Sequence, residues 1–354
     1  MSVVEQGANV AYRYWIYGLC LETAYRFRTP LTVAPATATC NLRFLCVPGD
    51  LGGSDGDTAV PPSADALYLS QERNWCGEHV LEIYATADGR LMRFPGVADF
   101  LVSPGRIVCR LHDAELGFMV DLCLLGHVMS YYLEMTGVSA LHAGAVVHDG
   151  RAVLFAADRQ GGKSTLVTSL VAAGFPLLAD DIAALELSAE KVLCRHAFPQ
   201  LKLTPQQALR FVGSAEGFGL VHPDFPKLSV PADRVGSIAT QALQVARIYL
   251  LERRAPDDAD VAIRMEALGP GEALIQLVRH SFLAEALGEH GTVGARGGEL
   301  ETAVRVRFQR LAAIARSMVV KRLCYPSGYH HLPEVHRAVL ADLGEAQGVE
   351  RQAS

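Results

Sequence analysis

Apolar and polar residues follow two different periods along this chain, and the change of period divides it near residue 115. In the first part, short runs of aromatic and aliphatic residues with polar residues between them predict β-strands. The dipeptide Asp88-Gly89 predicts a tight hairpin turn, and the Gly/Asp/Pro-rich residues 48–64 predict a mobile loop. We therefore expect a small, mostly β module over residues 1–115. Its predicted strands lie within 12–23, 40–47, 79–85, 90–94 and 106–111.

A helical period covers roughly 116–136 and opens a second region that we expect to span 116–354. Next, ALHAGAVV (140–147) and RAVLFAA (151–157) predict a hairpin with Asp149-Gly150 at its tip. A helix closed by Gly174 follows. The predicted elements beyond it are a strand over 175–187, an irregular proline-rich stretch over 197–245, a strand over 245–253, helices over 271–287 and 302–318 with a flexible joint over 291–298, a strand over 319–326 and a last helix over 332–343. The predicted fold class is α/β (α+β).

Composition narrows the partners and the compartment. The chain has 32 Lys and Arg against 38 Asp and Glu, a net charge of -6, so we expect no nucleic-acid partner. Its eight cysteines form no CxxC pair, which favours a reducing, cytoplasmic setting. We expect no signal peptide, because no basic start precedes an apolar run. The apolar window 116–135 carries Asp121, His127 and Glu134, so it predicts a buried helix and no membrane span.

The stretch AADRQGGKSTL (156–166) matches the phosphate-binding loop motif at all but its first glycine, and it lies between a predicted strand and a predicted helix. In such a loop, backbone N–H groups at a helix N-terminus hold phosphates, the lysine reaches the β- and γ-phosphates and the hydroxyl binds Mg²⁺. Gly162, Lys163 and Ser164 fit, whereas Ala157 replaces the leading glycine. If that position needs a positive φ, alanine costs about 1 kcal/mol. The predicted ATP-binding residues are Ala157, Asp158, Arg159, Gln160, Gly161, Gly162, Lys163, Ser164 and Thr165; Arg159 either contacts a phosphate or points into solvent.

Two carboxylates and a histidine complete the candidate chemistry. Asp180 and Asp181 follow Lys163 after one helix and one returning strand. Adjacent strand residues face opposite sides, so one carboxylate can face a metal and the other the acceptor if a bulge or strand end opens the geometry. Ser164 and Asp180 are the candidate Mg²⁺ ligands. The alternative reading of the Asp-Asp pair is a solvated strand end. His142 lies in an apolar strand, where a satisfied core histidine is the usual interpretation.

Residues 141–185 resemble the catalytic segment of HPr kinase/phosphorylase, which shows a His-Gly strand, a hairpin, a Gly-Asp-Ser-Gly-x-Gly-Lys-Ser loop, a helix and an Ala-Asp-Asp strand. The wider layout resembles HPr-kinase-like proteins of lasso-peptide and related peptide pathways. The resemblance implies a phosphoenolpyruvate carboxykinase-like P-loop kinase domain that uses ATP and Mg²⁺. It implies that His142 is an active-site histidine, that Lys163 acts on the phosphates and that Asp181 accepts the proton of a substrate hydroxyl.

The chain also departs from this family. Ala143, Ala157, Arg159 and Gln160 differ from the family's residues, and HAFPQLKL (196–203) replaces the downstream signature with its metal-binding glutamate. That absence argues against a reverse, phosphate-removing reaction. Lys202, within this stretch, is a candidate to hold phosphate or substrate.

These patterns support one leading hypothesis and two alternatives. The leading hypothesis is an ATP-dependent kinase acting on a hydroxyl, expected to be serine, of a peptide or small protein such as a ribosomal natural-product precursor. One alternative is a nucleotide-binding scaffold whose catalysis has decayed, which Ala157 would favour. The other is a kinase of a small-molecule hydroxyl. The sequence leaves the oligomeric state open, with a homo-oligomer as one possibility.

Overall fold

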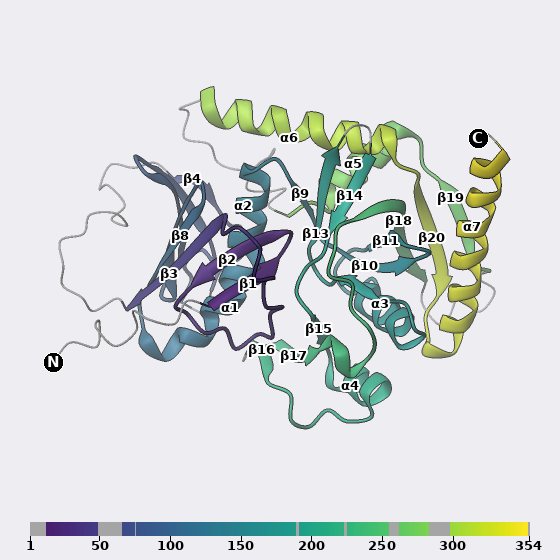
Figure 1. The fold of residues 1–354 in the computed structure, drawn as a ribbon, viewed down its shortest axis with the longest axis horizontal. Helices are drawn as coiled ribbons and strands as arrows, with labels where there is room; N and C mark the ends of the chain where they lie inside the picture. Colours follow the sequence, from purple (N-terminus) through teal and green to yellow (C-terminus); the bar gives the residue numbers. More distant parts are fainter. Residues whose placement is uncertain are drawn as a thin grey trace. The chain divides into compact units, whose positions relative to one another are not determined.

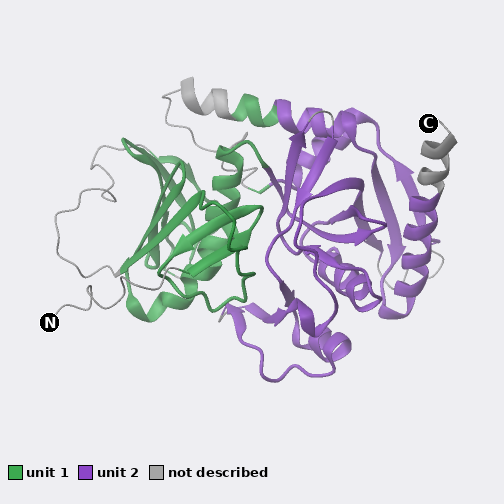
Figure 2. Ribbon diagram, in the orientation of Figure 1, with its two compact units in different colours: residues 1–138, 282–308 green, residues 139–281, 309–354 purple. Residues whose placement is uncertain are grey.

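The computed structural model describes residues 12–48, 66–74, 76–188, 191–222, 225–254, 262–282 and 298–352. These residues form a mixed α/β structure with several sheets, divided between two compact units (Figure 1, Figure 2). The first unit comprises residues 1–138 and 282–308, and the second comprises 139–281 and 309–354. Apart from Pro48 and Gly298, the predicted mobile loop over 48–64 and the predicted joint over 291–298 lie outside the described residues.

The first unit is built on an eight-stranded sheet in the order β1-β2-β3-β8-β7-β6-β5-β4. Strands β2, β3 and β8 are parallel neighbours, whereas the other pairs are antiparallel. The predicted hairpin at Asp88-Gly89 is present, but its turn is Ala87-Asp88, because Thr86 pairs with Gly89. The strands are β1 (Tyr12–Ile16), β2 (Leu19–Thr23), β3 (Leu42–Pro48), β4 (Ala66–Leu69), β5 (Glu82–Thr86), β6 (Gly89–Phe94), β7 (Ala98–Ser103) and β8 (Arg106–Leu111).

A helical segment follows this sheet as η2 (Ala114–Gly117), α1 (Phe118–Cys123), the π-helical turn η3 (Leu124–Val128) and α2 (Met129–Met135). By length and composition it could cross a membrane, with a mean hydropathy of 1.4, but 61% of that window is buried inside the structure. Its Asp121 accepts hydrogen bonds from the backbone N–H groups of Arg28 (2.9 Å) and Thr29 (2.7 Å). This carboxylate ties the helix to residues 28 and 29 within the first unit, which extends to Val138.

The second unit contains a mixed sheet in the order β12-β10-β11-β18-β14-β13-β9, with β20 also on β18 and β19 on β20. Helix α3 contacts β10, β11 and α7. A Cβ at Gly144 would lie 2.7 Å from Val167 Cγ2, so this glycine allows the helix to approach β10 closely. The elements are β9 (Ser139–Leu141), β10 (Ala143–His148), β11 (Arg151–Ala156), α3 (Lys163–Ala172), β12 (Leu177–Ala179), β13 (Ala183–Ser188), β14 (Lys191–Arg195), β18 (Leu243–Arg254), β19 (Arg264–Ala267), α5 (Pro270–Arg279), α6 (Gly298–Ser317, which crosses the unit boundary), β20 (Val320–Pro326) and α7 (Leu332–Gln352).

The proline-rich stretch predicted as irregular is in fact largely ordered. It forms a small antiparallel sheet of β15 (Gln200–Leu203), β17 (Phe225–Pro231) and β16 (Leu220–His222), and the helix α4 (Pro205–Val212). Helix α4 begins with a capping box in which Thr204 and Gln207 satisfy each other's backbone N–H groups. Two prolines stand where no amide donor is needed, Pro205 in the first turn of α4 and Pro231 at the end of β17.

Candidate active site

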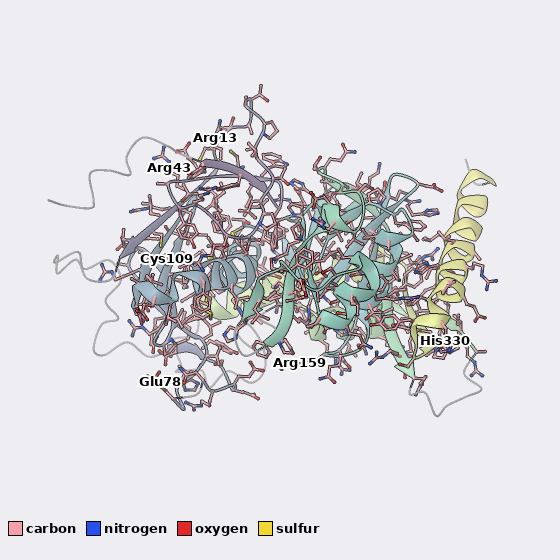
Figure 3. The ribbon with its side chains drawn as sticks, turned by 90° about the horizontal axis from the view of Figure 1, so that it is seen from below. Arg13, Arg43, Glu78, Cys109, Arg159 and His330 are labelled. Atoms are coloured by element: carbon pink, nitrogen blue, oxygen red, sulfur yellow. The ribbon has the colours of Figure 1, made fainter. Side chains whose placement is uncertain are left out.

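The predicted phosphate loop connects the buried strand β11 to helix α3 through residues 157–162, which we call the glycine loop. The N–H of Gly161 donates to the carbonyl of Asp158 at 2.8 Å, which closes a turn. Gln160 (φ 65°) and Gly162 (φ 91°) adopt left-handed conformations, and Gly162 is the N-cap of α3. Arg159 is exposed and is labelled in Figure 3. The strand–loop–helix context predicted from the sequence is therefore present.

Ala157 is not strained, because its position does not take the positive φ at which alanine would carry a cost. Among the described non-glycine residues with positive φ are Gln160 and Asp181, but not Ala157, whose side chain is 2% exposed. A Cβ added at Gly161 would lie 2.8 Å from the Cβ of Ala157. The alanine methyl thus occupies the space that Gly161 leaves. The loop accommodates the missing leading glycine by having a glycine four residues later.

We expect Gly161→Ala to weaken the loop and Ala157→Gly to restore part of the loss. Overpacking of this kind costs roughly 1–3 kcal/mol, and rescue is partial because the new Cβ would still lie 2.9 Å from the Asp158 carbonyl oxygen. Thermal unfolding and nucleotide affinity of both single variants and the double variant measure the coupling, which should reach about 1 kcal/mol. Strictly additive effects would show that the two positions do not share this space.

Two side chains hold the outer side of the glycine loop. Arg253 Nη2 donates to the Gln160 carbonyl at 2.8 Å, and the Tyr325 hydroxyl lies 3.5 Å from the Gly161 carbonyl. Arg253 and Tyr325 are register partners on the parallel strands β18 and β20. Burial raises the pKa of Tyr325 to about 12, so its hydroxyl remains a donor. The Gly161 carbonyl and the Gly162 N–H belong to one trans peptide, in which the two groups point in opposite directions. Because the Gly161 carbonyl faces Tyr325 on the outer side, the Gly162 N–H points toward the inside of the loop.

Three predicted or candidate residues converge on the carboxylate of Asp181. Its Oδ1 lies 3.1 Å from His142 Nε2 and 3.3 Å from Lys163 Nζ. Its Oδ2 accepts a hydrogen bond from Lys202 Nζ at 2.6 Å. The structure thus brings together the histidine, the loop lysine and the second carboxylate, which are far apart in sequence, and it adds Lys202.

This convergence depends on a break in the strand predicted over 175–187. The single strand predicted over 175–187 is two strands, because Asp181 adopts a left-handed backbone (φ 73°) between β12 and β13. His142 likewise lies at a bend between β9 and β10, and not within the hairpin. The strands before Asp181 and after His142, β12 and β10, pair with each other. The strands after Asp181 and before His142, β13 and β9, also pair with each other. Both residues therefore lie between paired strands, where their side chains meet.

Asp181 is an ionised carboxylate in this setting. Burial tends to raise its pKa, but the charges of Lys202 and Lys163 and the hydrogen bond with His142 outweigh burial and hold the pKa well below its ordinary value. On Lys202, burial tends to lower the pKa, but the charge and hydrogen bond of Asp181 prevail and raise it. The cluster is therefore a carboxylate surrounded by cations, which suits the binding of a further anion.

Asp180 is the residue that best fits a cation. Its side chain is 5% exposed, and its Oδ2 accepts the backbone N–H of Lys202 at 3.0 Å. Its Oδ1 is buried and has no hydrogen-bond partner among the described residues. Buried polar oxygens normally have a partner, and Mg²⁺ takes oxygen ligands, often one or two carboxylates plus substrate phosphates. Among the described residues, no group of three or more His, Cys, Asp or Glu side chains could hold a metal ion.

The two hydroxyls that follow Lys163 have different surroundings. Ser164 is half-buried in the first turn of α3, next to the loop. The Thr165 hydroxyl accepts a hydrogen bond from Gln207 Nε2 at 2.6 Å, which ties α3 to α4. Ser164 therefore fits the predicted Mg²⁺ role, whereas Thr165 has a structural contact.

Sequence reasoning also missed a contribution from α5. Arg279 Nη2 donates to Asp158 Oδ2 at 2.7 Å, and His280 Nε2 lies 4.0 Å from Asp158 Oδ1. Burial lowers the pKa of His280, so its ring is neutral near pH 7. In the sequence these two residues carry only a helical pattern, so no local signal pointed to the loop.

No protein-family model matches the chain, and no curated protein matches it in sequence. Among solved structures, the HPr(Ser) kinase/phosphatase from Coxiella burnetii matches with 12% sequence identity and a TM-score of 0.34, over 60% of this chain and 95% of that chain. A TM-score this low shows only a distant likeness.

Proposed function

We propose that the chain is an ATP-dependent phosphotransferase with a P-loop kinase domain of the phosphoenolpyruvate carboxykinase type. The observation that carries the proposal is the meeting of His142 Nε2 and Lys163 Nζ on one oxygen of Asp181, directly beside the glycine loop. A phosphate-binding loop with its lysine and an ionised carboxylate that can orient the acceptor are parts that phosphoryl transfer uses, and the histidine lies in the same cluster.

The loop side of the site would hold the nucleotide. The inward N–H of Gly162 and the N-terminus of α3 favour phosphates. Lys163, a residue that is 7% exposed, supplies a positive charge. Asp180 and Ser164 would hold Mg²⁺, which when bound neutralises charge on the phosphates. Lys163 would leave Asp181 for the phosphates, and Lys202 and His142 would remain on the carboxylate.

The Asp181 side would hold the acceptor. A hydroxyl that donates to Asp181 has its oxygen oriented toward the γ-phosphorus. As the new P–O bond forms, the bond to the β,γ-bridging oxygen breaks, ADP leaves and the hydroxyl proton passes to Asp181, with His142 able to take it onward. Asp181 would both orient the hydroxyl and accept its proton. Because its pKa is low, it would take that proton late in the transfer, which suits a loose transition state.

The acceptor we propose is a serine hydroxyl on a peptide or small protein in the cytoplasm. A small-molecule hydroxyl is the first alternative. The second is a nucleotide-binding scaffold without catalysis, and it loses its main support because Gly161 accommodates Ala157.

We expect the purified chain to bind ATP with Mg²⁺ and to transfer the γ-phosphate. Calorimetry with ATP, with and without Mg²⁺, measures binding. Incubation with γ-labelled ATP and a library of serine-containing peptides, with a parallel panel of small alcohols and sugars, measures transfer and separates the acceptor classes. Binding without any transfer would favour the scaffold. No binding of ATP at millimolar concentration would reject the proposed function.

A further inference from the structure

The end of helix α5 is fixed against the candidate active site by the backbone. The N–H of His142 donates to the carbonyl of His280 at 2.6 Å, and Leu141 and Ser281 form an antiparallel bridge. His280 itself is 9% exposed. Arg279 is the last residue of α5 and directly precedes His280, whose carbonyl bonds the backbone of His142. The backbone of Arg279 is therefore held close to His142, while its side chain reaches Asp158 in the glycine loop.

The side-chain partner of Arg279 is an exposed carboxylate on that loop. Arg279 Nη2 lies 2.7 Å from Asp158 Oδ2, and the two side chains are 58% and 59% exposed. An ion pair this exposed contributes little to stability, typically about 0–1 kcal/mol. The guanidinium can therefore exchange its carboxylate for a more highly charged anion at small cost.

A nucleotide in the glycine loop would present such an anion. Asp158 is the second residue of the loop, so its carboxylate would lie close to the polyphosphate and oppose it. A guanidinium offers five donors in a fixed fork that matches phosphate oxygens. The two arginines at the loop have different partners. Arg253, on β18, donates to the backbone carbonyl of Gln160, whereas Arg279, on α5, pairs with the side chain of Asp158.

We propose that Arg279 is the residue that distinguishes a nucleoside triphosphate from a diphosphate, by moving from Asp158 to the terminal phosphate. This inference rests on the proposed function and deepens it, because it assigns a γ-phosphate contact to an arginine outside the loop. Asp158 then serves as the resting partner that holds Arg279 beside the loop before the nucleotide arrives.

The test compares ATP with ADP in the full-length chain. Calorimetry with each nucleotide and Mg²⁺ is run on wild type, Arg279→Gln, Asp158→Asn and the double variant. We expect Arg279→Gln to lower ATP affinity by about 10-fold, as for the loss of one charge-assisted hydrogen bond, and to leave ADP affinity within a factor of two. The double variant should remain weak for ATP, because the lost contact is to the phosphate.

A matched control and two contrary outcomes make the result decisive. Arg254→Gln removes the same charge from a similarly exposed pair with Glu252 (46% and 40% exposed) and should leave both affinities unchanged. Equal losses for ATP and ADP, with recovery in the double variant, would show that Arg279 only screens Asp158 and would overturn the inference. Unchanged ATP affinity in Arg279→Gln would overturn it too. A wild type that binds neither nucleotide would instead reject the proposed function.

Discussion

Asp181→Asn should lower kcat by roughly 100-fold or more while ATP affinity changes little. The amide keeps the shape of the carboxylate but cannot accept a proton, and a positioned proton acceptor contributes about 10²–10⁴-fold. Its NH₂ group would also face Lys163, Lys202 or His142 with a donor where the structure has an acceptor. Steady-state phosphate transfer to a serine-containing peptide, with ATP titrated separately, gives kcat and the ATP affinity.

The pH profile adds a second readout for the same residue. The folded pKa of Asp181 is held well below its ordinary value, so its stabilising contribution is present above the unfolded pKa near 3.9 and is lost only as pH falls through the folded pKa. Asp181 should therefore cause no loss of rate between pH 7 and pH 5. A wild-type rate that falls through a single ionisation near pH 5, absent from Asp181→Asn, would contradict this. An Asp181→Asn variant with the kcat of wild type would contradict the expected 100-fold loss of rate.

Lys163→Met should lower the affinity for both ATP and ADP on the order of 10- to 100-fold, the effect of losing charge-assisted hydrogen bonds to phosphate. A phosphate-loop lysine reaches the β- as well as the γ-phosphate, so both nucleotides should suffer, unlike in Arg279→Gln. Methionine retains much of the volume of a side chain that is 7% exposed. Calorimetry with each nucleotide and Mg²⁺ measures the change.

The matched control for Lys163→Met is Lys321→Met. Lys321 is a partly buried lysine of the same unit that pairs with Asp342, and it lies on β20. Its loss should lower thermal stability and leave nucleotide affinity unchanged in the folded protein. If Lys163→Met and wild type bind ATP equally, the glycine loop is not the nucleotide site.

Local sequence was sufficient to predict backbone structure where a short motif determines the geometry of its own turn or helix start. The Asp149-Gly150 hairpin is a two-residue turn with both residues at positive φ, as the dipeptide predicts. The glycine loop and α3 follow as expected from Gly162-Lys163-Ser164. The α4 capping box was readable in Thr204 and Gln207, yet the surrounding prolines led to a prediction of irregular structure.

The rest of the site required tertiary information. Nothing local to Asp181 announces its left-handed backbone, because the apolar residues on either side continue a strand pattern. Arg253 and Tyr325 reach the loop only because β18 and β20 are parallel neighbours. The sequence also did not predict that Gly161 leaves room for the Ala157 methyl, because the phosphate-loop motif specifies each position independently. Sequence therefore predicted the local elements around the candidate site better than the tertiary contacts that hold them.

The order of synthesis has an unusual effect on the first unit, because that unit includes residues 282–308 as well as 1–138. Arg307, 7% exposed, donates to the carbonyl of Phe282 at 3.1 Å and pairs with Glu134 at 3.5 Å. A ribosome adding about 5–20 residues per second reaches Arg307 roughly 10–30 s after Val138. During that interval Glu134 lacks this guanidinium, while the segment 139–281 of the second unit emerges. The amino-terminal unit therefore begins to fold first but is completed only after most of the second unit has been made.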